Sequence, residues 1–199
     1  MIYPISGARL PREGSKLDYL YQRSRTHKHR GLDFPAPLGT RVIASEPGVV
    51  VKVVNKYTPG FRGYGKVVVI QGPSGKYFLY AHLNKTLVSF GDYVELGQPI
   101  GHVGKTQYSK ANPAGDMKSG PHLHFEISAT PYPQHAEASR LNPRIGLTQG
   151  RFTDVPAIEP SIPPKIRIKK PPVKSSDGKI LAVGVGILAL IWLLLQMKR

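Results

Sequence analysis

The chain has 199 residues and no cysteine, and its 28 Lys and Arg residues against 12 Asp and Glu residues give a formal net charge of +16. The lack of cysteine excludes disulfides and thiolate metal sites, so a transition-metal site would have to use His, Asp, Glu or water. The charge favours anionic partners, namely nucleic acid, acidic lipid headgroups or anionic cell-wall polymer, and does not choose among them.

The chain opens with a polar lead-in, residues 1–22. Its first stretch, MIYPISGARLPREG, has no basic start and only a short apolar run that Pro4 interrupts, so it lacks the pattern of a secretory signal. It carries no clear propeptide. We expect these residues to precede a folded domain that spans residues 23–150.

A first group of polar residues follows in the stretch HKHRGLDF, where His29 and Asp33 are four residues apart. On a helix this spacing would place both side chains on one face. Gly31 and the following FPAP favour a turn that leads into a strand instead, because glycine lets the backbone fold so that residues on either side of it converge.

The rest of residues 23–150 reads as a mainly β domain. No segment before the C-terminal tail sustains a long helical period, and glycine and proline recur at strand-length intervals. His82 ends one apolar strand, in YFLYAHL. The expected strands lie in residues 42–54 (two strands), 65–83 (two strands joined by a turn), 93–104 and 121–128.

Two histidines, His122 and His124, lie one residue apart in the apolar stretch GPHLHFEI. Because successive strand residues point to opposite faces, both imidazoles face the same way. Glu126 is expected on the opposite face from these histidines and is not assigned as a general base.

These histidines and Asp33 supply neutral imidazoles and a carboxylate. Zinc in catalytic sites commonly takes three such ligands and keeps one position open for water. A hydrolase also needs a group that takes and returns protons, for which histidine suits neutral pH. Two histidines on one strand face would allow one to bind metal while the other meets the substrate or the attacking water.

Five motifs in a fixed order make the chain resemble the lysostaphin/LytM-type zinc metallopeptidases, which cut peptidoglycan peptides. The motifs are HRGLDFPAPLGTRVIASEPGVV, GYGKVVVIQ, YAHL, GDYVELGQPIGHVGKT and GPHLHFEI, between about Thr26 and Ser128. The resemblance implies a compact antiparallel β-sheet domain that has a narrow groove and binds one Zn²⁺ per chain. It implies His29, Asp33 and His124 as the metal ligands. It implies His82 and His122 as the catalytic histidines, in general-base and transition-state-stabilising roles that are not divided between them.

The sequence departs from the family pattern in the polar stretch QYSKANPAGDMK, residues 107–118, which we expect to lie near the groove and to affect substrate choice. The other histidines are expected to be peripheral. His27 would line the groove or be solvated, the alternative being a metal ligand in place of His29, and His102 and His135 would lie on the surface. Tyr80 is expected to be a structural strand aromatic, the alternative being a hydrogen bond near the site.

Residues 151–178 form a linker with six prolines and a basic second half. Paired prolines favour extended polyproline II structure. The linker reads as a semi-rigid tether whose charge suits acidic headgroups, and a merely solvated linker is the alternative.

The chain ends in an apolar segment, residues 179–199. Ile180 to Leu195 are 16 uncharged residues. As a helix this run would cover about 24 Å, close to the thickness of the hydrocarbon core. We expect one C-terminal transmembrane helix, the alternative being a buried core helix.

The resemblance implies a zinc-dependent endopeptidase that hydrolyses peptide bonds in peptidoglycan stems or cross-bridges. A zinc-binding but inactive wall-binding or scaffold domain is the alternative, although such domains typically lose a ligand or catalytic residue and this chain keeps all five. A lipoyl- or biotinyl-like carrier, which FGDYVELGQPIG also resembles, leaves HRGLD and PHLHFE unexplained. The sequence does not indicate the bond that is cleaved, the Gram type of the target or the oligomeric state.

The expected location is a membrane, although peptidoglycan lies outside the cytoplasmic membrane and the peptidase domain follows no export signal. Lysines on the domain side of the anchor would keep that domain on the cytoplasmic side. We expect a membrane-anchored protein in the virion membrane of a bacteriophage, or otherwise in a bacterial membrane. Its expected partners are the peptidoglycan peptide, the membrane, and acidic lipid or anionic wall polymer at the linker, with no specific nucleic acid.

Overall fold

The computed structural model describes residues 1–132, 139–145 and 147. These residues form strands and loops, which confirms the mainly β, antiparallel prediction. The strands are β1 (Gln22–Ser24), β2 (His27–Lys28), β3 (Leu32–Pro35), β4 (Arg41–Ile43), β5 (Gly48–Val54), β6 (Lys66–Gln71), β7 (Tyr77–Thr86), β8 (Tyr93–Val94), β9 (Pro99–Val103), β10 (His122–Ser128) and β11 (Arg140–Leu141).

No helix within the described residues is long and apolar enough to cross a membrane. The expected linker at 151–178 and the expected anchor at 179–199 lie outside those residues, as does His135.

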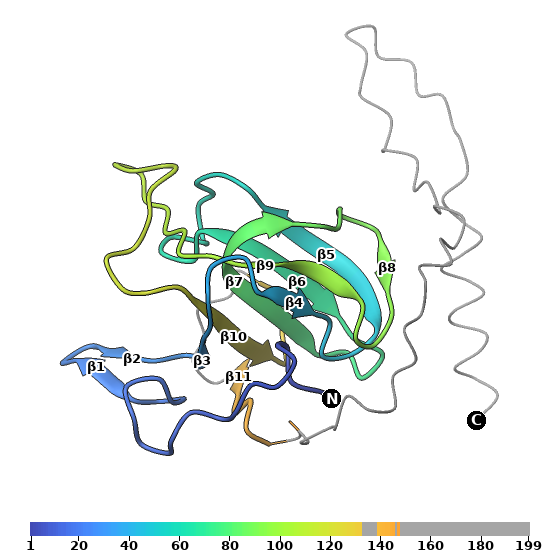
Figure 1. Ribbon diagram of the computed structural model, residues 1–199, viewed down its shortest axis with the longest axis horizontal. Coiled ribbons are helices and arrows are strands. Elements are labelled where there is room, and N and C mark those ends of the chain that lie inside the picture. The colour runs from blue at the N-terminus through green and yellow to red at the C-terminus, as the bar shows by residue number, and fades with distance from the viewer. Residues whose placement is uncertain (133–138, 146, 148–199) are drawn as a thin grey trace, which may run out of the picture. The chain divides into compact units, whose positions relative to one another are not determined.

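Nine of the strands form one antiparallel sheet, with the order β11-β10-β7-β6-β5-β8 (Figure 1). Strand β3 also pairs with β10, and β9 connects β7 to β4. Strands β1 and β2 form a separate hairpin that leads into β3. The segment with His29 therefore lies between this hairpin and the strand that carries Asp33.

The central strands are apolar on both faces because each face is covered. In β6, Val68 and Ile70 belong to one hydrophobic cluster and Val67 and Val69 to another. The larger cluster also takes alternate residues of β10, namely Leu123, Phe125 and Ile127. The other residues of β10, which include His122 and His124, therefore point to the other side of the strand.

Strand β7 changes partner at His82. Residues up to Ala81 pair with β10, and residues from Leu83 pair with β9. At the change, His82 has a φ of 60°, a left-handed conformation that is uncommon for a residue other than glycine. Its backbone N–H still donates to the carbonyl of Tyr64, at 2.9 Å. His82 thus lies at the point along one edge of β7 where the partner strand changes from β10 to β9.

The first 22 residues, expected only to precede the domain, pack onto it. Tyr3 and Ile5 are buried in the same hydrophobic cluster as Leu32 and Phe34 of β3. The backbone N–H of Asp33 donates to the carbonyl of Leu17, at 2.9 Å. This segment consequently helps to fix the strand that carries Asp33.

Candidate metal centre and active site

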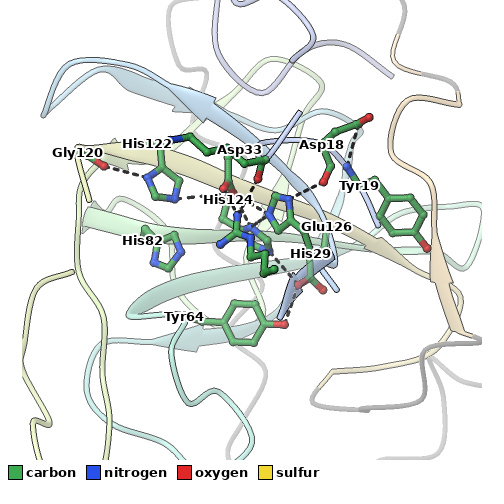
Figure 2. A network of polar contacts seen from close by, with 12 residues as sticks. Asp18, Tyr19, His29, Asp33, Tyr64, His82, Gly120, His122, His124 and Glu126 are labelled. Carbon is green, nitrogen blue, oxygen red and sulfur yellow. Dashed lines mark hydrogen bonds and ion pairs between the residues drawn. The ribbon is translucent and has the colours of Figure 1, made fainter. Parts of the chain in front are cut away.

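Three predicted ligands meet in the structure. Asp33 and His124 are directly opposite each other in the ladder between β3 and β10, and His29 lies just before β3 (Figure 2). Asp33 Oδ1 lies 3.0 Å from His29 Nε2 and 2.8 Å from His124 Nδ1, and these two nitrogens lie 3.1 Å apart. All three residues are buried.

This donor set fits zinc. Tetrahedral zinc with bonds of about 2.0–2.1 Å to His and Asp places neighbouring ligand atoms about 3.3 Å apart. One ligand atom from each of the three residues lies within 4.8 Å of the others, so small movements suffice for binding. Two imidazoles and one carboxylate are a usual set for catalytic zinc, and they leave a position for water or substrate.

Gly31 allows the ligand segment to approach β10 closely. A Cβ at this position would lie 2.3 Å from the carbonyl oxygen of Phe125. The sequence pointed to this glycine as a flexible turn residue, and the structure gives a different reason for it. Only a residue without a side chain lets this backbone pass against β10, which brings His29 and Asp33 to His124.

The second ring nitrogen of each ligand histidine is held by an acceptor. His29 Nδ1–H donates to the backbone carbonyl of Asp18, at 2.7 Å. His124 Nε2–H donates to Glu126 Oε1, at 2.9 Å. A carbonyl or carboxylate oxygen only accepts, so the other nitrogen of each ring keeps its lone pair for a metal.

The third ligand also has an outer partner. Arg23, on β1, donates to Asp33 Oδ2 at 2.5 Å, while Oδ1 faces the two histidines. The side chain of Arg23 is 40% exposed, so this cation closes the solvent side of the carboxylate. The two oxygens of Asp33 consequently have separate partners.

The predicted catalytic histidines present equivalent nitrogens. His122 Nδ1–H donates to the carbonyl of Gly120 and His82 Nδ1–H to that of Thr106, both at 2.9 Å. Each Nε2 is therefore an acceptor. His122 Nε2 lies 3.7 Å from Asp33 Oδ1, and the rings of His82 and His122 are 4.9 Å apart. In Figure 2 both rings lie on the same side of the ligand cluster.

Burial gives the two kinds of histidine different protonation. Burial lowers the pKa of His82 to about 3, with the neighbouring His124 and His122 adding to the effect. His82 is thus neutral at ordinary pH. Burial also acts on His124, but hydrogen bonds to Asp33 and Glu126 outweigh it and raise its pKa to about 9. Without metal, His124 is therefore protonated on both ring nitrogens, and positively charged, at neutral pH.

The expected position of Glu126 was wrong. Residues two apart on a strand share a face, so Glu126 continues the line of His122 and His124. It is fully buried and contacts His124 Nε2, on the far side of the ring from the ligand atom. Glu126 is still not assigned as a general base. The reason is that it lies behind the His124 ring, and not that it points to the opposite face of the strand.

Three other residues at the site were missed: Asp18, Arg23 and Tyr64. Tyr64 donates its hydroxyl to Glu126 Oε1 at 2.7 Å, and its ring lies 5.8 Å from that of His124. The strand period could have pointed to Glu126. Asp18 and Arg23 lie in or beside the segment treated as a lead-in, and no pattern marks them.

The remaining candidates lie away from the cluster. His27 is exposed on β2, and His102 is half-buried on β9. Tyr80 is fully buried, and its hydroxyl accepts the backbone N–H of Ser45 at 2.8 Å, which agrees with a structural role.

The unusual polar stretch at 107–118 begins next to a contact of the predicted catalytic histidine His82. It follows Thr106, whose carbonyl holds His82. With Arg62 and Gly63, which precede Tyr64, it lines a cavity of about 270 Å³. None of the residues that line this cavity is a predicted ligand or catalytic histidine, so the expected effect of the stretch on substrate choice stays a prediction.

A bound zinc would polarise a carbonyl and make a water molecule more acidic. The chain's own residues would complete a hydrolytic site. His29, Asp33 and His124 would hold the metal, and Nε2 of His82 or His122 could accept a proton on its open side. This combination suits hydrolysis of a peptide bond.

Comparisons with known proteins agree with this chemistry. A family model described as Peptidase family M23 matches residues 27–141. The chain is 38% identical over 117 residues to the peptidoglycan DD-endopeptidase ShyA of Vibrio cholerae, covering 59% of this chain and 24% of that protein. It is 37% identical over 98 residues to lysostaphin of Staphylococcus staphylolyticus, covering 49% of this chain and 18% of that protein.

Solved structures show the same fold. The catalytic domain of lysostaphin from Staphylococcus simulans matches with a TM-score of 0.51 at 28% identity, covering 64% of this chain and 86% of that domain. The chain spans about a quarter of the length of ShyA, whereas it covers most of the lysostaphin domain. Since the family match covers more than half of the chain, the protein belongs to peptidase family M23 and carries a metalloendopeptidase domain.

Proposed function

We propose that this protein is a zinc-dependent endopeptidase that hydrolyses peptide bonds in peptidoglycan stems or cross-bridges. The observation that carries the proposal is the convergence of His29 Nε2, Asp33 Oδ1 and His124 Nδ1 beside two histidines with acceptor nitrogens. Relatives named as a peptidoglycan DD-endopeptidase and as lysostaphin support peptidoglycan as the substrate class.

Each of the five residues has a role in the proposed hydrolysis. His29, Asp33 and His124 bind the metal. His82 and His122 take a proton at Nε2 from the attacking water, or hydrogen-bond the substrate oxygen as charge develops on it. Their Nδ1–H bonds to backbone carbonyls keep both rings oriented for these tasks.

The test is digestion of purified walls by the full-length, zinc-loaded protein. Gram-negative and Gram-positive sacculi are incubated with and without a chelator, and the released fragments are identified by mass spectrometry. Chelator-sensitive release of defined peptides is expected, and the fragments name the bond. The variant His122→Ala serves as the control that should release nothing.

The opposite result is also informative. A folded, zinc-bound protein that releases no fragment from either kind of wall would contradict the proposal and favour a binding or scaffold domain.

We also propose that residues 179–199 anchor the enzyme in a membrane and that the protein is carried in the virion of a bacteriophage. The uncharged run of 16 residues from Ile180 to Leu195 supports the anchor, and the basic linker suits an anionic surface. Sedimentation with membranes that survives alkaline carbonate is expected. Proteomics of purified particles that lacked the protein would contradict the virion location.

A further inference from the structure

We infer that Glu126 is a positioning residue of the metal centre, which holds His124 in the tautomer that offers Nδ1 to the metal. The inference rests on the metal site of the proposed function, and it concerns metal binding itself. It can therefore be tested without any wall substrate.

The two oxygens of Glu126 contact four groups, two at each oxygen: three hydrogen-bond donors and the guanidinium of Arg140. Oε1 accepts from His124 Nε2 at 2.9 Å and from the Tyr64 hydroxyl at 2.7 Å. Oε2 accepts from the Tyr132 hydroxyl at 3.1 Å and lies 2.7 Å from Arg140 Nη1. Three hydrogen bonds and one ion pair thus leave neither carboxylate oxygen without a partner.

Arg140 favours the charged form of Glu126. The glutamate is fully buried, and a buried carboxylate is stable as an anion only when it is paired and hydrogen-bonded. The guanidinium supplies the charge and the other three donors complete the shell. As an anion Glu126 can only accept, so the proton must stay on His124 Nε2 and the lone pair on Nδ1.

Glu126 makes more contacts than a structural ion pair with Arg140 would need. The pair between Arg140 on β11 and Glu126 uses Oε2 and leaves Oε1 for the metal ligand. Tyr64, which shares Oε1, also accepts the backbone N–H of His82 through its carbonyl. Glu126 thus contacts the predicted ligand His124 directly, and it also contacts Tyr64, as Figure 2 shows. The backbone of Tyr64 in turn holds the predicted catalytic histidine His82.

The nearly isosteric change Glu126→Gln distinguishes the positioning of His124 from a purely structural ion pair with Arg140. The new amide nitrogen must face one of the two donor pairs. Arg140 cannot accept a hydrogen bond, whereas His124 and Tyr64 can, so the nitrogen should turn toward His124. His124 Nε2 would then have to accept, and its proton would move to Nδ1, the metal-binding atom.

The experiment measures zinc affinity of the full-length protein by competition with a chelator at fixed pH. Glu126→Gln should weaken zinc binding about 10–100-fold, the usual effect of losing such an outer partner. Asp116→Asn neutralises an exposed carboxylate that pairs with Lys105, outside this network, and it should keep the parent affinity. Equal affinities in Glu126→Gln and the parent, or equal losses in the two variants, would overturn the inference.

Two further readouts separate positioning from folding. In the zinc-loaded parent, the His124 Nε2–H proton should resonate far downfield in NMR spectra, and in Glu126→Gln it should move upfield or exchange with solvent. If Glu126→Gln does not fold, Glu126→Asp keeps the charge for Arg140 and withdraws the oxygen from His124. Unchanged zinc affinity in Glu126→Asp would overturn the inference. Weaker zinc binding in Glu126→Gln, together with a zinc-loaded parent that releases no wall fragment, would leave the inference standing and count against the proposed function.

Discussion

Asp33 and His124 are cross-strand partners, and Asp33 Oδ1 lies 2.8 Å from His124 Nδ1. The pairing of β3 with β10 therefore fixes two of the three proposed ligand atoms. Asp33→Asn keeps the size of the side chain but removes its charge. We expect loss of stoichiometric zinc after dialysis, measured by elemental analysis. Asp116→Asn, at an exposed carboxylate that pairs with Lys105, should keep its zinc, and zinc retention in Asp33→Asn would exclude this carboxylate as a ligand.

His122 should be needed for cleavage and not for metal binding. Its Nδ1–H bond to Gly120 leaves Nε2 facing the cluster, 3.7 Å from Asp33 Oδ1. His122→Ala should lower the rate of wall-peptide hydrolysis about 10²–10⁴-fold, the range for loss of a general acid or base, with zinc content unchanged. His27→Ala, at an exposed histidine on β2, is the matched control and should match the parent rate. Zinc loss in His122→Ala would show that the division into ligand and catalytic histidines is wrong.

The left-handed backbone at His82 should affect stability separately from its imidazole. Both His82→Ala and His82→Gly remove the ring, but only glycine adopts a φ of 60° without steric cost. We expect His82→Gly to be more stable than His82→Ala by about 1 kcal/mol, from denaturant unfolding. Both variants should be inactive. An alanine variant as stable as the glycine variant would mean that the backbone at this position is not strained.

Gly31 should be intolerant of even the smallest side chain. Its Cβ would lie 2.3 Å from the carbonyl oxygen of Phe125, so β10 or the ligand segment must move. Gly31→Ala should cost about 1–3 kcal/mol of stability and weaken zinc binding. Gly120→Ala, where an added Cβ meets nothing within 4 Å, should change stability by less than about 0.5 kcal/mol. Equal unfolding free energies for the two variants would contradict the close approach at Gly31.

The sequence predicted the strands well because they are marked locally. Strand-length apolar runs between glycine- and proline-containing turns identify β5, β6, β7 and β10 without any knowledge of their partners. The two-residue period of a strand should also have placed Glu126 on the face of His124, and applying it to one more residue would have avoided that error. Five residues from three of the motifs, His29, Asp33, His82, His122 and His124, also meet in the structure.

The outer partners could not be predicted because they depend on distant contacts. Tyr64 and Glu126 are 62 positions apart, and His29 and Asp18 meet only after the first residues fold back on β3. Nothing in the sequence near Arg23 shows that its guanidinium reaches Asp33. Hydrogen bonds between remote segments leave no local period, so only the three-dimensional structure reveals them.

Zinc binding should strengthen as the pH rises toward 9. Without metal, Asp33 and Glu126 raise the pKa of His124 from 6.5 to about 9, so the metal must displace a proton from this ring. Below about pH 9, each unit of pH should change the apparent zinc affinity about tenfold.

For the zinc-free protein the effect of pH on stability has the opposite sign. The proton that His124 binds in the folded state stabilises the protein below pH 6.5, and this contribution is lost as the pH rises through 9. Chelator competition between pH 6.5 and 9, together with unfolding of the zinc-free protein, tests both slopes, and a zinc affinity that is flat across this range would show that His124 does not carry the displaced proton.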